Sequence, residues 1–326
     1  MNFEQKDIIS IKPEYNFEGE LLLMIRLTNL CDYNCNYCNL HDNTSKIIHE
    51  SEKIIEVVEN ILISLPSSYK KIIYHLYGGE PTVYKYVKEF LLTVSELNEK
   101  YKKDFRIELK TNFSKSINFF LDIININKNI YISMSYQNHQ RKDNLTDLKN
   151  KVIKFKNVIN NIDIMLEEEE NSKPNEIIEF ANFVKDNNIP VQLNTIDNKD
   201  INELILYQDI ISKFKCIDDR INVITKNSIE NISVIELKSN FDNFFGYKCN
   251  VGLHQFIIDA SSKLIKIFLC YSDNLKNTNL VWDNSMDYNY LQKRIKFFNK
   301  PNFCLHKKCL CEVYIEKNKG RYNGLN

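Results

Sequence analysis

The sequence lacks several features that mark common protein classes. Lys plus Arg equals Asp plus Glu at 43 each, so no net charge is available to recruit nucleic acid. No apolar run reaches the roughly 18 residues of a membrane span, and residues 1–10 lack a signal-peptide core. We therefore expect a cytoplasmic protein with no membrane partner. The basic segment 292–308 is interpreted as a solvated rim, with contact to a polyanion as the alternative.

Glycine is also scarce, with seven in 326 residues, so the adjacent pair Gly78-Gly79 stands out. Apolar residues make up 43% of the chain, which permits a sizeable core. Nine cysteines are present in a chain that we expect to be cytoplasmic, where thiols stay reduced. Their number therefore favours metal or redox chemistry over disulfides.

Strand-like stretches alternate with helical patterns over the first two thirds of the chain. We expect strands at 21–29, 71–77, 105–112, 129–136, 162–168 and 191–196. We expect helices at 51–65, 83–101 and 175–188, among others. This alternation, about six repeats to residue 215, predicts βαβ units and a parallel sheet or barrel.

Alternate residues of these strands form two different faces. The apolar face, suited to covering helices, carries Ile107, Leu109, Ile130, Ile132, Ile162, Ile164, Leu166, Val191 and Leu193. The opposite face carries Arg26, Thr28, His75, Tyr77, Glu108, Lys110, Asn112, Ser133, Ser135, Asp163, Glu167, Gln192 and Asn194. A polar face is costly to bury unless it meets water or a polar ligand. We therefore predict an α/β fold, an open partial barrel whose interior is a binding chamber; a one-residue register error in some strands is the alternative.

Three cysteines, Cys31, Cys35 and Cys38, follow the first predicted strand with CxxxCxxC spacing. Four cysteines would close a zinc or iron–sulfur site, whereas three leave one iron of a four-iron cluster free to bind a substrate or cofactor. Zinc is the alternative, but it usually comes with paired CxxC or His spacing, and no second pair is nearby. The spacing therefore predicts a cluster with one reactive iron.

Three further motifs follow the triplet "LTNLCDYNCNYC", namely "YGGEP" (77–81), "LKTN" (109–112) and "ISMS" (132–135). Each stands at the C-terminal end of a predicted strand, where parallel barrels keep their active sites. In this order the motifs resemble the radical SAM superfamily, over about residues 20 to 200. The resemblance implies a partial (β/α)6 barrel that binds a 4Fe-4S cluster and S-adenosylmethionine. Bare turn chemistry is the alternative for the two glycines.

The resemblance also implies roles for individual residues. The open iron would bind the amino and carboxylate groups of S-adenosylmethionine, and the segment of Gly78, Gly79 and Glu80 would hold the methionine amino group. Tyr37 would lie against adenine. Asn112, Ser133 and Ser135 would hold ribose or carboxylate, although the family often has an acidic residue where Ser135 stands. A reductant such as flavodoxin or ferredoxin would supply one electron, and a 5′-deoxyadenosyl radical would then remove a hydrogen atom from the substrate under anaerobic conditions.

A second group of cysteines lies near the C-terminus: Cys249, Cys270, Cys304, Cys309 and Cys311. The turn residues "DASSK" (259–263) between two apolar runs predict a hairpin, which would place Cys249 and Cys270 at the ends of one small unit. The group resembles the twitch or SPASM extensions of radical SAM enzymes, which carry auxiliary clusters, although a full SPASM pattern has more cysteines. Five suffice for one auxiliary 4Fe-4S cluster. Which four would bind it stays open, and a structural zinc is the alternative.

We expect a lead-in over 1–20, the partial barrel over 21–215, a connecting segment over 216–245 and a small, cysteine-rich α+β extension over 246–326. Cys216 stands alone at the start of the connecting segment. It is either a buried small residue or a thiol that returns a hydrogen atom to a substrate radical, as an epimerase requires.

The polar chamber favours a small polar substrate, such as a sugar, an aminocyclitol or a nucleotide-linked sugar. The expected reaction is dehydrogenation or epimerisation. The first alternative is a peptide or protein maturase, of the kind that modifies ribosomal peptides or sulfatases. The second is a non-enzymatic metal-binding module, which would not cleave S-adenosylmethionine.

Overall fold

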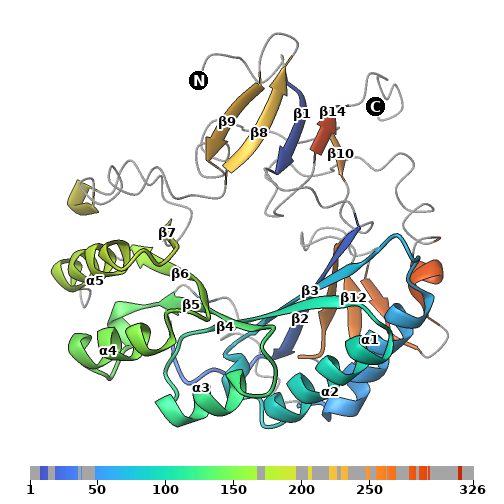
Figure 1. Ribbon diagram of the computed structural model, residues 1–326, viewed down its shortest axis with the longest axis horizontal. Helices are drawn as coiled ribbons and strands as arrows, with labels where there is room; N and C mark the ends of the chain where they lie inside the picture. The colour runs from blue at the N-terminus through green and yellow to red at the C-terminus, as the bar shows by residue number, and fades with distance from the viewer. Residues whose placement is uncertain are drawn as a thin grey trace.

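The computed structural model describes part of the chain. The described residues are 8–13, 19–35, 38, 48–166, 173–195, 205–207, 220–225, 229–233, 247–249, 255–261, 263–268, 279–283, 286–291, 293 and 315–317. They form two sheets, one of nine strands with helices along one side and one of five strands (Figure 1). Among these residues, no helix has the length and apolar character needed to cross a membrane.

Parallel strands in chain order form most of the nine-stranded sheet. They are β2 (Glu20–Thr28), β3 (Lys71–Gly78), β4 (Asp104–Thr111), β5 (Ile130–Tyr136), β6 (Ile159–Leu166) and β7 (Val191–Thr195). Strands β7 and β13 (Asn279–Val281) form the two edges and do not pair with each other, so the barrel is not closed. The predicted α/β partial barrel is therefore confirmed.

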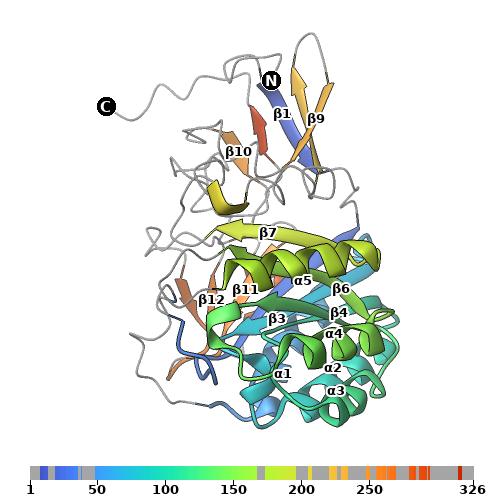
Figure 2. The ribbon, with the colours of Figure 1, turned by 90° about the vertical axis from the view of Figure 1, so that its left-hand side faces the viewer.

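The helices that connect these strands lie on one side of the sheet in both views (Figures 1 and 2). They are α1 (Ser51–Ser64), α2 (Val87–Lys100), α3 (Ile117–Ile124), α4 (Leu145–Phe155) and α5 (Pro174–Asp186), with single turns at η2 (Pro81–Val83), η3 (Asn138–Gln140) and η6 (Ile205–Tyr207). The helix expected over 83–101 begins later because Glu80 caps the separate turn η2, which has Pro81 at its start.

The two predicted faces of the strands are confirmed where side chains are described. Every residue assigned to the apolar face is buried, and most of these side chains are fully inaccessible beneath the helices. On the polar face, Arg26, His75, Tyr77, Lys110, Ser135 and Asp163 are partly exposed, whereas Thr28, Glu108, Asn112 and Ser133 are buried. The side chains of Glu167, Gln192 and Asn194 lie outside the described residues. The partial exposure of Arg26, Lys110 and Asp163 on this face is what an interior chamber requires.

The chain beyond the barrel contributes to both sheets. Strand β11 (Gln255–Asp259) pairs in parallel with β2 and antiparallel with β12 (Lys266–Phe268), so the hairpin predicted at 259–263 is confirmed. The five-stranded sheet is antiparallel and has the order β10 (Tyr247–Cys249), β14 (Ile315–Lys317), β1 (Ile8–Pro13), β8 (Arg220–Thr225) and β9 (Ile229–Ser233). Both ends of the sequence thus share one sheet, and the division into domains stays a prediction.

Candidate active site

The cysteine triplet lies on the loop that follows β2, at the C-terminal edge of the parallel strands. Cys31 is exposed, Cys35 is buried and Cys38 is intermediate, and each of the three is a thiol rather than half of a disulfide. Two hydrogen bonds lie within the loop: the Cys38 N–H donates to the Cys35 carbonyl at 3.0 Å, and the Tyr33 N–H donates to the Cys31 Sγ at 3.4 Å. The three sulfur atoms therefore come from one short stretch of the sequence.

The glycine pair packs its backbone directly onto this loop. The Gly79 N–H donates to the Thr28 carbonyl at 2.8 Å, and the Glu80 N–H donates to the Leu30 carbonyl at 2.7 Å. Gly78 has φ +150°, and a Cβ there would lie 2.2 Å from the Thr28 carbonyl oxygen. A Cβ on Gly79 would lie 2.3 Å from the Leu30 carbonyl oxygen. Close backbone approach therefore requires glycine at both positions.

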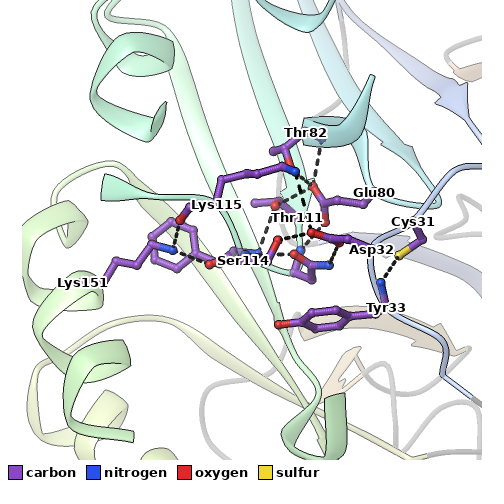
Figure 3. Close-up of polar contacts among 11 residues, drawn as sticks. Cys31, Asp32, Tyr33, Glu80, Thr82, Thr111, Ser114, Lys115 and Lys151 are labelled. Carbon is purple, nitrogen blue, oxygen red and sulfur yellow. Dashed lines mark hydrogen bonds and ion pairs between the residues drawn. The ribbon is translucent and has the colours of Figure 1, made fainter. Parts of the chain in front are cut away.

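The Glu80 carboxylate points into the protein and joins the glycine segment to the end of β4 (Figure 3). Its Oε1 accepts from the Thr82 N–H at 2.9 Å, from the Thr82 hydroxyl at 2.6 Å and from the Thr111 hydroxyl at 2.7 Å. Its Oε2 accepts from the Asn112 N–H at 2.6 Å. Burial raises the pKa of Glu80, while these hydrogen bonds act in the opposite direction. Glu80 thus fixes the relative position of two strand ends.

The three residues expected to hold ribose or carboxylate have different environments. The Asn112 Nδ2 donates to Asp32 Oδ1 at 2.7 Å. The Ser135 hydroxyl accepts a hydrogen bond from the Gln137 side chain. The Ser133 hydroxyl is buried and has no hydrogen-bond partner among the described residues, which leaves it available to a ligand. Their roles toward a cofactor stay predictions.

Several charged groups on the inner face lie beside groups of opposite charge. The His75 Nε2 lies 3.0 Å from Glu108 Oε2, and the Arg106 Nε lies 2.9 Å from Glu108 Oε1. Burial opposes ionisation of Glu108, but contact with His75 and the charge of Arg106 outweigh it and lower the pKa of Glu108. On the neighbouring strands, the Arg26 Nη1 lies 3.4 Å from Asp259 Oδ2. At these positions the inner face is therefore polar but largely charge-balanced.

Several candidate residues lie outside the described part of the chain: Tyr37, Cys216, Cys270, Cys304, Cys309 and Cys311. Cys249 is the last residue of β10, and nothing further is described of its side chain. Among the described residues, no three His, Cys, Asp or Glu side chains converge as a single metal ion would require. A four-iron cluster does not need such convergence, because each cysteine binds a different iron.

Sequence reasoning did not single out Asp32, Arg106 or Asp259. Arg106 lies two residues before Glu108 on β4 and therefore on the same face of the strand. The alternation of side chains along the strand could have predicted its position. Asp259 reaches the inner face because β11 pairs with β2, a contact between positions 233 residues apart that no local pattern reports. Asp32 lies inside the triplet, but its partner Asn112 is 80 residues away.

A family model described as the Radical SAM superfamily matches residues 25–196, which is more than half of the chain. No curated protein sequence matches. Among solved structures, histidine-tagged anSMEcpe with bound AdoMet (S-adenosylmethionine) aligns with a TM-score of 0.58 and 16% identity, over 88% of this chain and 85% of that chain. Native anSMEcpe with bound AdoMet and Kp18Cys peptide aligns with a TM-score of 0.56 and 16% identity, over 88% and 84%. At this identity the likeness supports a common fold.

Proposed function

Because the chain belongs to the radical SAM superfamily, we propose that it is an enzyme that generates a 5′-deoxyadenosyl radical and removes hydrogen from a small polar substrate. One observation carries the proposal. Gly78 and Gly79 pack without Cβ atoms against the backbone of the loop that bears Cys31, Cys35 and Cys38. Because of this contact, the glycine motif and the cysteine motif of the family lie next to each other.

The residues at this place fit the two cofactors that the family implies. Cys31, Cys35 and Cys38 would hold a 4Fe-4S cluster, and thiolate sulfur is the ligand that such clusters take. Although Cys31 as a residue is exposed, partial desolvation of its thiol raises the pKa to about 12, with the Tyr33 N–H acting against this shift. A coordinating thiol is nevertheless deprotonated by the charge of the metal. The glycine segment would lie beside the methionine end of S-adenosylmethionine. When bound, the two cofactors together supply the 5′-deoxyadenosyl radical.

The inner face suggests the kind of substrate. Arg26 pairs with Asp259, and Glu108 pairs with both His75 and Arg106, so hydrogen-bonding groups are present without a strong excess of one charge. A neutral molecule with several hydroxyl or amino groups matches such a wall better than a strongly charged one. This favours a sugar or an aminocyclitol. For a nucleotide-linked sugar, the sugar would enter the chamber and the phosphates would remain outside.

A peptide or protein maturase is the alternative. It is favoured by the Kp18Cys peptide bound in the structure of similar fold, whose chain this one covers to 84%. The two functions differ in their genetic surroundings. A neighbouring gene for a sugar transferase would support the first, whereas a short precursor peptide encoded nearby would support the second.

We also propose one auxiliary 4Fe-4S cluster, held by four of Cys249, Cys270, Cys304, Cys309 and Cys311. Anaerobically reconstituted protein is then expected to hold about eight irons, and a variant with Cys31, Cys35 and Cys38 all replaced by Ala about four. Iron and zinc are measured together by elemental analysis. About four irons in the intact protein, with zinc in addition, would reject the auxiliary cluster and favour a structural zinc.

Whether the reaction ends in oxidation or inversion depends on Cys216. An epimerase must return a hydrogen atom to its substrate radical, and a thiol can donate one, whereas a dehydrogenase passes an electron to an acceptor such as the auxiliary cluster. We favour dehydrogenation, because the five cysteines near the C-terminus indicate an electron-accepting cluster more strongly than the single Cys216 indicates a hydrogen donor. Cys216→Ala is then expected to keep full turnover of the native substrate. Loss of product with continued consumption of S-adenosylmethionine, together with solvent deuterium at one carbon of the wild-type product, would instead identify an epimerase.

A further inference from the structure

Asp32 links the cysteine loop to the loop that follows β4. Its Oδ1 accepts from Asn112 Nδ2 at 2.7 Å, its Oδ2 accepts from the Ser114 hydroxyl at 2.6 Å, and the Lys115 Nζ lies 3.8 Å away (Figure 3). Asp32 therefore forms a hydrogen-bonded bridge between two strand ends.

The loop that receives Asp32 is itself held in place by two cations. The Lys151 Nζ, from α4, is buried and donates to the carbonyl oxygens of Phe113 and Lys115. The Arg141 Nη1 donates to the Asn112 carbonyl oxygen at 2.8 Å. Burial, with repulsion from Arg141, lowers the pKa of Lys151 to about 8. Asp32 is therefore joined to a fixed support.

Asn112 is the point at which the glycine segment and the cysteine loop meet. Its N–H donates to Glu80 Oε2 at 2.6 Å, and its Nδ2 donates to Asp32 Oδ1 at 2.7 Å. The glycine segment holds the first part of the cysteine loop through the backbone of Thr28 and Leu30. Asp32 then holds the part that begins at Cys31. The same residue of the loop after β4 therefore sets the position of both motifs.

We propose that Asp32 is a positioning residue, which orients the loop of Cys31, Cys35 and Cys38 against Asn112 and Ser114. It would thereby set where the cluster lies relative to the glycine pair. This inference rests on the proposed function and deepens it. In an enzyme reaction that depends on the position of the bound groups, a displacement of about 1 Å can lower the rate about a hundredfold.

The test uses the full chain with Asp32→Ala and Asp32→Asn. Asp122→Asn is the matched control, because it removes the same charge from an exposed pair with Lys88 on the outer side of the sheet. In metal-free protein, Asp32→Ala is expected to speed the exchange of backbone amide hydrogens in two peptides, 29–38 and 112–116. Asp122→Asn is expected to leave the exchange rates of both peptides unchanged. If both peptides of Asp32→Ala exchange at the wild-type rate, the proposal is overturned.

After reconstitution, the cluster is expected to bind with its iron content unchanged. Adding S-adenosylmethionine should then change the electron paramagnetic resonance spectrum of the reduced cluster less in Asp32→Ala than in the wild type. The rate of 5′-deoxyadenosine formation per cluster should fall about ten- to a hundredfold, with a much smaller change in KM. If Asp32→Ala loses iron, and its rate per protein falls only in proportion to that loss, the role of Asp32 is merely structural and the proposal is overturned.

Ser114→Ala removes one partner of Asp32 and serves as a second variant. Ser114→Ala is expected to lower the rate of 5′-deoxyadenosine formation per cluster less than Asp32→Ala does. In the double variant the two effects should not add, because both changes break the same contact. Full additivity would contradict the bridge. If the wild type itself fails to cleave S-adenosylmethionine, the proposed function is rejected, whereas the exchange experiment still decides whether Asp32 orients the loop.

Discussion

Gly79→Ala is expected to lower the cleavage of S-adenosylmethionine about a hundredfold. The new Cβ would lie 2.3 Å from the Leu30 carbonyl oxygen and 2.6 Å from that of Asn29, whereas ordinary contact begins at 3.4 Å. Both oxygens belong to the backbone, so the cysteine loop or the end of β3 must move by about 1 Å, which is the scale of misplacement that costs such a factor. The rate of 5′-deoxyadenosine formation per cluster measures the effect.

Gly19→Ala is the control for this variant, because it strains the opposite end of β2. Gly19 has φ +84°, and a Cβ there would lie 2.8 Å from the Ser68 carbonyl oxygen. The strain should lower the free energy of unfolding by about 1–3 kcal/mol but leave the rate per cluster unchanged. If Gly79→Ala cleaves S-adenosylmethionine as fast as Gly19→Ala, the close approach of the two loops has no part in the reaction.

The local patterns of the sequence were sufficient to predict the barrel. Alternation along β4 and β5 placed Ile107 and Ile132 under the helices and Glu108 toward the interior, because in each strand successive side chains point to opposite faces. The motifs predicted the family by resemblance, and the family model that matches residues 25–196 confirms it. These predictions depend only on residues that are close together in the sequence.

Contacts between distant segments could not be predicted in the same way. The parallel pairing of β11 with β2 brings Asp259 beside Arg26, and nothing in the pattern of residues 255–259 names its partner strand. Likewise, Lys151 on α4 supports the loop after β4, although it lies 38 positions beyond Phe113 in the sequence. A lysine in an amphipathic helix is normally expected in solvent, and only the fold shows that this one is buried.

The central claim is that the cysteine triplet holds a cluster that cleaves S-adenosylmethionine. The most direct measurement is the formation of methionine and 5′-deoxyadenosine by reconstituted protein, with a strong reductant and without oxygen. The wild type is expected to form both products. The variant with Cys31, Cys35 and Cys38 replaced by Ala is expected to form neither, because thiolates are the cluster's protein ligands. Equal amounts of product from the two proteins, or none from the wild type, would contradict the claim.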